Sequence, residues 1–332
     1  MKILYSLPAT GSGHITRCNE LLNDLKKIGD VDIFIGGQNS FLLNKLPFKP
    51  KYTSKGLSLF YSNDGSFNYS KLISQRNVIN LFNEIKDIPI EKYDLIINDF
   101  EGITSLACQL KKVPCIQFGH QASFNFNNIK KPKGNFLISD LVMKYFAYGK
   151  KSVGIHFKNY DRGIFYPIIK RSILKGKYSK KNFTLVYLPQ YENIHLSRVL
   201  KKIFPYKFKI FSYSVDRIYE DENLTWYPAS IKKFDEFLLS CNCVITGGGF
   251  ETPAETLYLN KKLISIPIKN HFEQLSNSEC LKDIGVKVLN DVKDLNFNTF
   301  DYEFQKKNNI NYKYIDQKNE MIEVLYSFAK KI

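Results

Sequence analysis

The sequence lacks any apolar run of the length that crosses a bilayer, so we expect no membrane-spanning helix. Its first residues, MKILYSLPATGSGH, are apolar only briefly before Pro8 and a glycine loop interrupt them. A signal peptide needs a longer apolar core, so we expect a cytoplasmic location. Low-complexity tracts are also missing, and 44% of the 332 residues are hydrophobic. The chain can therefore fill the cores of two ordinary domains.

Patterns typical of metal sites are absent as well. The cysteines do not show the paired spacing of a zinc site, so we expect buried free thiols. Acidic residues are scattered, and no D-x-D pair ends an expected strand, so we predict neither a bound metal nor another cofactor. The six cysteines stand at positions 18, 108, 115, 241, 243 and 280.

Acidic residues are few in comparison with basic ones: 32 Asp and Glu face 48 Lys and Arg, a net charge of +16. Lysine pairs recur along the whole chain and do not gather in one arm. They indicate either solvated helix faces or attraction to an anionic membrane or acceptor. No helix-turn-helix, zinc-finger or RNA-recognition pattern accompanies the charge, so we expect no nucleic-acid partner.

Strands and helices alternate in both halves, which predicts an α/β fold of two Rossmann-like, doubly wound domains. We expect a first domain over 1–170, a linker over 171–182, a second domain over 183–315 and a terminal helix over 316–332. Parallel strands of such domains direct their carboxyl ends to a crevice where ligands bind. The expected strands are KILYSL, VDIFIG, LSLFY, DLIIND, CIQFG, FTLVYL, FKIFSY, LTWY, CVIT and LISIPI, with helices near 15–28, 70–86, 101–112, 191–202, 231–240, 252–259 and 272–283.

The segment TGGGFETPAE, residues 246–255, reads as a strand end, a glycine loop and a helix start. Three glycines let backbone N–H groups approach a ligand, and the helix start favours a phosphate. Glu255 lies one turn further along and can reach a ribose. Glu273 and Gln274 open a later helix, where a carboxylate and an amide can bind sugar hydroxyls. A tight turn that binds nothing is the alternative for the glycines alone.

A second motif, GSGHITR at residues 11–17, follows the first expected strand. His14 stands at a helix start, whose dipole disfavours a protonated imidazole and so preserves a base. Asp99 follows the strand DLIIN and should emerge at the same sheet edge. A carboxylate there would fix the imidazole tautomer. Glu101 is a second candidate, and the sequence does not decide whether Asp99 supports His14 or Glu101 acts on the acceptor.

Together these motifs resemble the GT-B glycosyltransferases, close to the plant secondary-product box, to the lipid II-forming N-acetylglucosaminyltransferase and to their bacterial relatives. The resemblance implies two Rossmann-like domains with a cleft between them, and a catalytic His14 assisted by Asp99. Where this chain has Gly247 the box usually has His, and Phe250 replaces its Trp. The implied donor residues are Gly247, Gly248, Gly249, Phe250, Thr252, Glu255, Glu273 and Gln274; on the acceptor side we assign Gly13, Arg17, His120 and Gln121, the last two with a structural role as the alternative.

The function expected from this resemblance is metal-independent, inverting transfer of a hexose-type sugar from a nucleoside diphosphate sugar, with UDP favoured, to a hydroxyl. Cell-surface glycan synthesis is the expected context. Alternatives on the same fold are a sugar-nucleotide hydrolase, a 2-epimerase and a non-catalytic nucleotide-sugar-binding protein. Residues 124–151 mix aromatics with lysines, which indicates either an ordinary loop with a core helix or peripheral contact with an anionic membrane and a lipid-linked acceptor.

Overall fold

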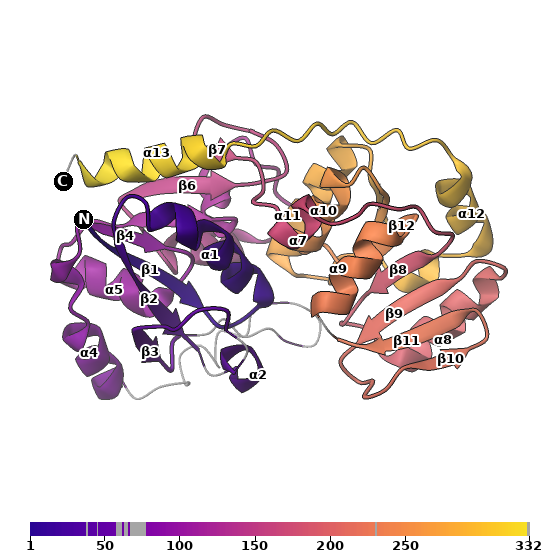
Figure 1. Ribbon diagram of the computed structural model, residues 1–332, viewed down its shortest axis with the longest axis horizontal. Coiled ribbons are helices and arrows are strands. Elements are labelled where there is room, and N and C mark those ends of the chain that lie inside the picture. Colours follow the sequence, from indigo (N-terminus) through magenta and orange to yellow (C-terminus); the bar gives the residue numbers. More distant parts are fainter. Residues whose placement is uncertain are drawn as a thin grey trace. The chain divides into compact units, whose positions relative to one another are not determined.

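The computed structural model describes residues 1–330 with the exception of positions 38, 45, 58–61, 63–65, 67–77 and 230. The chain forms two compact units, each built around a seven-stranded sheet (Figure 1). The first unit contains Met1–Ile129, Lys133–Ile168 and Ile315–Ile332, and the second contains Lys130–Pro132 and Ile169–Tyr314.

The first sheet has the strand order β3-β2-β1-β4-β5-β6-β7, with every neighbouring pair parallel. In the central strand β1, six consecutive residues are buried, as expected where helices cover both faces of a parallel sheet. The strands are β1 (Lys2–Pro8), β2 (Asp30–Gly36), β3 (Tyr52–Ser54), β4 (Leu95–Asn98), β5 (Ile116–Gly119), β6 (Lys151–Ile155) and β7 (Ile164–Phe165).

Alternating side chains direct the two faces of this sheet into different cores. Leu4 and Ile96 lie on one face and pack with Ile103 of α5. The C-terminal helix α13 packs beside β4, where Figure 1 shows it along the first unit, and Lys318 forms an ion pair with Asp24. The helices of this unit are α1 (Ser12–Leu25), α2 (Ser40–Leu43), α4 (Val78–Asp87), α5 (Gly102–Leu110), α6 (Leu137–Tyr145) and α13 (Lys318–Ala329), with the 3-10 turns η1 (Ile90–Lys92) and η2 (Gln121–Asn125).

The second sheet has the order β10-β11-β9-β8-β12-β13-β14, and only the edge strand β10 pairs antiparallel. Leu196 of α8 and Phe300 of α12 bury one face, whereas Phe237 of α9 packs against Phe211 on the other. The elements are β8 (Thr184–Tyr187), β9 (Phe208–Ser212), β10 (Tyr219–Asp221), β11 (Leu224–Pro228), β12 (Cys243–Thr246), β13 (Lys262–Ser265), β14 (Lys287–Val288), α7 (Arg171–Leu174), α8 (Asn193–Leu200), α9 (Ile231–Ser240), α10 (Glu251–Tyr258), α11 (Phe272–Asp283), α12 (Phe297–Gln305), η3 (Lys201–Ile203) and η4 (Val292–Asp294).

The predicted α/β fold with two Rossmann-like sheets is confirmed. Most of the expected strand LSLFY and the first part of the expected helix 70–86 lie outside the described residues. The stretch 171–182, expected as a linker, starts with α7 and belongs to the second unit. All six cysteines are buried, and none of them forms a disulfide. Within the described ranges, no helix is both long enough and apolar enough to cross a membrane.

Candidate active site

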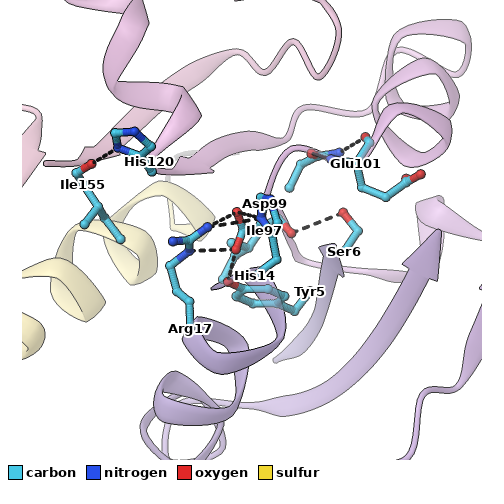
Figure 2. A network of polar contacts seen from close by, with 10 residues as sticks. Tyr5, Ser6, His14, Arg17, Ile97, Asp99, Glu101, His120 and Ile155 are labelled. Carbon is cyan, nitrogen blue, oxygen red and sulfur yellow. Dashed lines mark hydrogen bonds and ion pairs between the residues drawn. The ribbon is translucent and has the colours of Figure 1, made fainter. Parts of the chain in front are cut away.

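His14 and Asp99 meet at the carboxyl edge of the first sheet. Strands β1 and β4 are neighbours, so the residue after β4 emerges beside the loop that leads from β1 into α1. His14 lies in the first turn of α1, and its Nδ1 is 2.9 Å from Oδ1 of Asp99 (Figure 2). Both side chains are buried. An imidazole whose Nδ1–H is held by a carboxylate leaves the Nε2 lone pair to accept a proton.

Asp99 is surrounded by donors. Arg17 donates from Nε to Oδ2 and from Nη2 to Oδ1, each at 2.9 Å, and the Tyr5 hydroxyl donates to Oδ2 at 2.9 Å. Burial by itself would raise the pKa of Asp99, but the Arg17 guanidinium and then the His14 ring hold it well below its usual range. Asp99 is therefore an ionised carboxylate with its two oxygens fixed.

Glu101, the other acidic candidate, begins the helix α5. Its carboxylate accepts hydrogen bonds from the backbone N–H groups of Ile103, at 3.0 Å, and Thr104, at 2.7 Å, and from the Thr104 hydroxyl. It is 1% exposed, and burial raises its pKa. The structure thus brings Asp99, and not Glu101, to His14, because Glu101 is the N-cap of α5.

The residues assigned to the acceptor side occupy different surroundings. His120 is buried after β5 and lies 3.1 Å from the Ile155 carbonyl through Nδ1, as Figure 2 shows. Gln121 is buried at the start of η2, and Gly13 is part of the first turn of α1. Arg17, also in α1, is turned to Asp99. The structure therefore joins Arg17 to the His14 pair, while His120 packs in the core.

In the second unit, the glycine loop joins β12 to α10 and is fixed by side chains from α11. Gln274 Oε1 accepts from the backbone N–H of Gly248, at 3.1 Å, and of Ile268, at 3.0 Å. The amide of Asn277 donates to the Gly248 carbonyl at 3.0 Å. Gln274, predicted to bind the sugar, thus ties the glycine loop to the loop after β13 with its oxygen.

The three glycines differ in what surrounds them. A Cβ at Gly248 would lie 2.5 Å from the Gln274 carbonyl oxygen, so the close approach of α11 requires glycine there. A Cβ at Gly247 would be 3.3 Å from Gln274 Oε1, and at Gly249 it would meet nothing within 4 Å. The fold therefore does not explain the missing side chain at Gly249, whereas a ligand that approaches the backbone would.

The helix α10 begins directly after this loop. Phe250 is its N-cap and is buried, and its side chain makes no capping hydrogen bond. Thr252 follows in the first turn, and its carbonyl accepts from the Thr256 hydroxyl at 2.7 Å. The first backbone N–H groups of α10 have no partner within the helix and can bind an anion.

Glu255 is buried in α10 and pairs with a lysine that the sequence analysis did not identify. Lys170 Nζ lies 3.1 Å from Glu255 Oε2 and 2.6 Å from Asp235 Oδ1. Burial raises the pKa of Glu255 to about 8, although Lys170 acts in the opposite direction. Glu255 is 2% exposed, so a ribose would reach it only after some rearrangement of the pair.

Glu273 stands in the first turn of α11 and is half-buried. His271 is the N-cap of this helix: its Nδ1 accepts from the Gln274 N–H at 3.4 Å, and burial lowers the pKa of His271 to about 4. The N-terminal turn of α10 thus follows the glycine loop directly in the chain, and the N-terminal turn of α11 contacts this loop through Gln274. Across the part of the chain that the structure describes, no group of three or more His, Cys, Asp or Glu is placed to hold a metal ion.

Known proteins resemble this chain in sequence and in fold over most of its length. The family model described as "Glycosyl transferase family 1" matches residues 1–306. An uncharacterized glycosyltransferase of Methanosarcina acetivorans is 24% identical over an alignment 326 positions long, and the alignment covers 86% of this chain and 82% of the relative.

Solved structures share the fold at low identity. Acinetobacter baumannii MurG has a TM-score of 0.59 and 15% identity over 100% of this chain and 99% of its own. Arabidopsis thaliana UGT89C1 complexed with UDP has a TM-score of 0.62 and 12% identity over 99% of each chain. Phytolacca americana UGT2 with UDP-2-fluoro-glucose and pterostilbene has a TM-score of 0.60 and 12% identity over 99% of this chain and 94% of its own. The expected GT-B fold is confirmed. Because the family model covers most of its length, the chain belongs to glycosyl transferase family 1 and is a glycosyltransferase.

Proposed function

We propose that this glycosyltransferase transfers a hexose-type sugar from a nucleoside diphosphate sugar to an acceptor hydroxyl. The proposed donor is a UDP-sugar, and the transfer inverts the anomeric carbon and uses no metal ion. The observation that carries the proposal is the buried pair of His14 and the ionised Asp99. Such a pair is suited to taking a proton from a hydroxyl at neutral pH. Two structural neighbours are complexed with UDP and with UDP-2-fluoro-glucose, which supports the choice of donor.

The reaction is a single displacement. His14 Nε2 accepts the proton of the acceptor hydroxyl while its oxygen forms the bond to the anomeric carbon. The bond from this carbon to the diphosphate oxygen breaks, and its electron pair leaves with the diphosphate. Asp99 stabilises the imidazolium that forms. Attack and departure on opposite faces of the sugar invert the anomeric centre.

We assign the stabilisation of the negative charge on the diphosphate to the second unit. The backbone N–H groups of Gly247 and Gly249 and the start of α10 offer donors and a positive dipole end without any metal, whereas the Gly248 N–H is bound to Gln274. The Gln274 oxygen is used by the loop, so we assign its amide nitrogen, with the Glu273 carboxylate, to the donor sugar. Glu255 is assigned to the ribose after it separates from Lys170.

Transfer assays with a panel of nucleotide sugars test this proposal. His14→Ala and Asp99→Asn should lose transfer by about two orders of magnitude or more while UDP binding persists, because general-base catalysis contributes about that much. His195→Ala is the matched control, since this histidine is about half exposed on α8. Full transfer by His14→Ala would refute the role of His14.

The same assays separate the alternative functions. Release of free sugar at a full catalytic rate without acceptor would identify a hydrolase, and isomerised donor would identify an epimerase. Binding of the donor without any turnover would identify a binding protein. Each of these results would contradict transfer to a hydroxyl.

We also propose that the acceptor is lipid-linked and is met at an anionic membrane surface on the cytoplasmic side, in the synthesis of a cell-surface glycan. The helix α6 supports this, because its large apolar side chains are exposed: Leu137, Ile138, Leu141 and Tyr145 are 53–73% exposed. They lie at helical spacing along one side, and soluble proteins rarely leave such a stripe uncovered.

The charge around this stripe complements an anionic bilayer. Lys133, Lys150 and Lys151 flank α6 in the sequence and are exposed, and the one acidic residue of the segment 130–151, Asp140, pairs with Lys144. Apolar side chains that enter the interface and lysines that meet lipid phosphates act together. The buried side of α6 packs on η2, which begins with the predicted acceptor residue Gln121.

Sedimentation with vesicles tests the membrane proposal. Vesicles with anionic phospholipid should bind the wild type at low salt and bind the triple variant Leu137→Ser, Leu141→Ser, Tyr145→Ser much less. Ile194→Ser serves as control, because Ile194 is 61% exposed in the second unit. Equal binding of wild type and triple variant, or no binding to anionic vesicles, would refute it.

A further inference from the structure

Arg17 stands one turn after His14 on α1 and holds Asp99 in a fork. Its Nε and Nη2 atoms each donate at 2.9 Å, one to each oxygen of the carboxylate. Arg17 is 4% exposed and Asp99 is fully buried. Such a bidentate pair fixes both the position and the orientation of a carboxylate, which a lysine at the same place would not do.

Gly119, the last residue of β5, shows that the fold makes room for this pair. Its φ is +102°, and a Cβ there would lie 2.6 Å from Asp99 Oδ1 and 3.3 Å from Arg17 Nε and Nη2. Three elements, α1, the end of β4 and the end of β5, thus meet at the guanidinium and the carboxylate (Figure 2). The Arg17–Asp99 pair is therefore buried at this sheet edge, where the fold leaves space for it, and is not a surface contact.

Arg17 also touches the histidine. Its Nη2 is 3.1 Å from His14 Nδ1, and both nitrogens lie 2.9 Å from the same oxygen, Oδ1 of Asp99. Because Asp99 is ionised, Nδ1 carries the proton and both nitrogens donate to Oδ1. The remaining lone pair of the ring is then on Nε2.

We propose that Arg17 is a positioning residue for the transfer reaction: it orients Asp99 so that His14 keeps its proton on Nδ1, and its positive charge opposes a second proton on Nε2. The inference rests on the proposed function, in which Nε2 of His14 receives the acceptor proton.

The sign of the effect follows from the charges near His14. Asp99 alone would favour the imidazolium, and the guanidinium offsets that attraction. Tyr5 on β1 and Cys18 on α1 also interact with this carboxylate, and burial raises the pKa of both, so they are neutral at neutral pH; Glu20 is a further buried titratable residue, one turn after Arg17 on α1. Without the positive charge of Arg17, protonation of the His14 ring is opposed less, so the acidic limb of the transfer profile should lie at higher pH.

Two variants separate charge from geometry. Arg17→Met removes both the positive charge and the bidentate contact with Asp99. The acidic limb of the kcat/KM profile for transfer should then move up by about one to two pH units, with activity partly regained at alkaline pH. Arg17→Lys keeps the charge but not the fork, so kcat should fall about tenfold or more with the limb near its wild-type position. Arg162→Met is the matched control, because Arg162 is exposed in the same unit.

NMR gives a readout that does not need substrate. Nitrogen-15 spectra, assigned with His14→Ala, should show the Nδ1–H tautomer of His14 in the wild type and a changed proton distribution on the ring in Arg17→Met, measured on protein whose circular dichroism matches the wild type. If Arg17→Met does not fold, Arg17→Lys carries the test through its kcat and its tautomer.

Four outcomes would overturn the inference: an Nε2–H tautomer in the wild type, an unchanged acidic limb and ring spectrum in folded Arg17→Met, wild-type kcat in Arg17→Lys, or a rise of acceptor KM alone, which would make Arg17 an acceptor ligand. The proposed function fails differently, through full transfer by His14→Ala.

Discussion

Replacing Glu255 by Gln is expected to make the protein more stable at neutral pH, although Glu255 forms an ion pair in the structure. Lys170 faces two carboxyl groups, Glu255 at 3.1 Å and Asp235 at 2.6 Å, and Asp235 also accepts from the Ser172 hydroxyl at 2.6 Å. One cation balances one anion, so we assign the negative charge to Asp235 and a proton to Glu255. Burial, aided by the charges of Asp235 and Glu251, raises the pKa of Glu255 from 4.5 to about 8.

The expected magnitude follows from linkage. In the unfolded chain Glu255 ionises near its ordinary value of 4.5. At pH 7, about 2.5 units above that value, Glu255 is ionised in the unfolded chain and protonated in the folded one. Folding must therefore bind a proton, which costs about 3 kcal/mol. The folded pKa is the higher one, so the contribution of Glu255 to stability is complete below pH 4.5 and is lost as the pH rises from there to about 8. Gln cannot ionise, so the variant should lack this loss.

Urea unfolding of the full chain at pH 5, 7 and 8.5, followed by circular dichroism, measures the effect. Glu255→Gln should gain little at pH 5, up to about 3 kcal/mol at pH 7 and up to about 4.5 kcal/mol at pH 8.5. Glu236→Gln is the matched control, since Glu236 is exposed on α9. A variant that is destabilised at pH 7, or that keeps the wild-type pH dependence, would refute the reasoning and show that Glu255 is an ordinary ionised partner of Lys170. If Glu255 serves the ribose, the more stable variant should bind UDP more weakly, a common exchange of function for stability.

Three further changes test the glycine loop and the Asp99 cluster. Gln274→Met leaves the N–H groups of Gly248 and Ile268 without their acceptor and should cost about 1–3 kcal/mol in thermal unfolding, with a higher donor KM; an unchanged melting temperature would contradict the loop tie. Gly248→Ala should destabilise the protein because its Cβ would lie 2.5 Å from a backbone oxygen, whereas Gly249→Ala should leave the melting temperature unchanged and weaken only UDP binding; equal effects of the two would refute the difference in space. Tyr5→Phe removes one donor to the buried Asp99 and should cost about 1.5–3 kcal/mol in urea unfolding; no loss would mean that this hydrogen bond is not stabilising.

The sequence was sufficient to predict the fold because both sheets consist of short apolar strands that alternate with helices, a pattern that leaves few topologies. The strands that it missed are short or atypical. β7 and β14 have two residues each, β3 and β10 have three, and β6 begins with a lysine and contains a glycine. Such strands form because they pair with a neighbour already in the sheet, which no local pattern reveals.

Asp99 and Glu101 illustrate the limit at the site. Both follow β4, separated only by Phe100, and sequence reasoning could not choose between them. The choice depends on the backbone, because Phe100 adopts a left-handed conformation with φ of 63°, and Glu101 then caps α5. The part played by Arg17 had a signal in the sequence, since it follows His14 by three positions and so shares its side of α1.

Lys170 had no such signal. It stands 85 positions before Glu255, next to a basic stretch whose composition is typical of a linker. Its burial depends on how the segment around α7 packs beside α9 and α10, which is a property of the tertiary structure. Long-range ion pairs of this kind remain hidden from periodicity and spacing.

The buried carboxylates of the two units differ in their charge, and this predicts that pH affects donor binding but not the support of His14 by Asp99. In the first unit Arg17 compensates Asp99 one for one, so Asp99 stays ionised and can support His14 over a wide pH range. In the second unit Glu255 shares Lys170 with Asp235, so it carries a proton until the pH approaches about 8. A hydroxyl of ribose can donate more strongly to an ionised carboxylate than to a protonated one. Donor affinity should therefore rise between pH 6 and 9 as long as Glu255 is present, and this rise should vanish in Glu255→Gln, whereas Asp99→Asn should leave it in place.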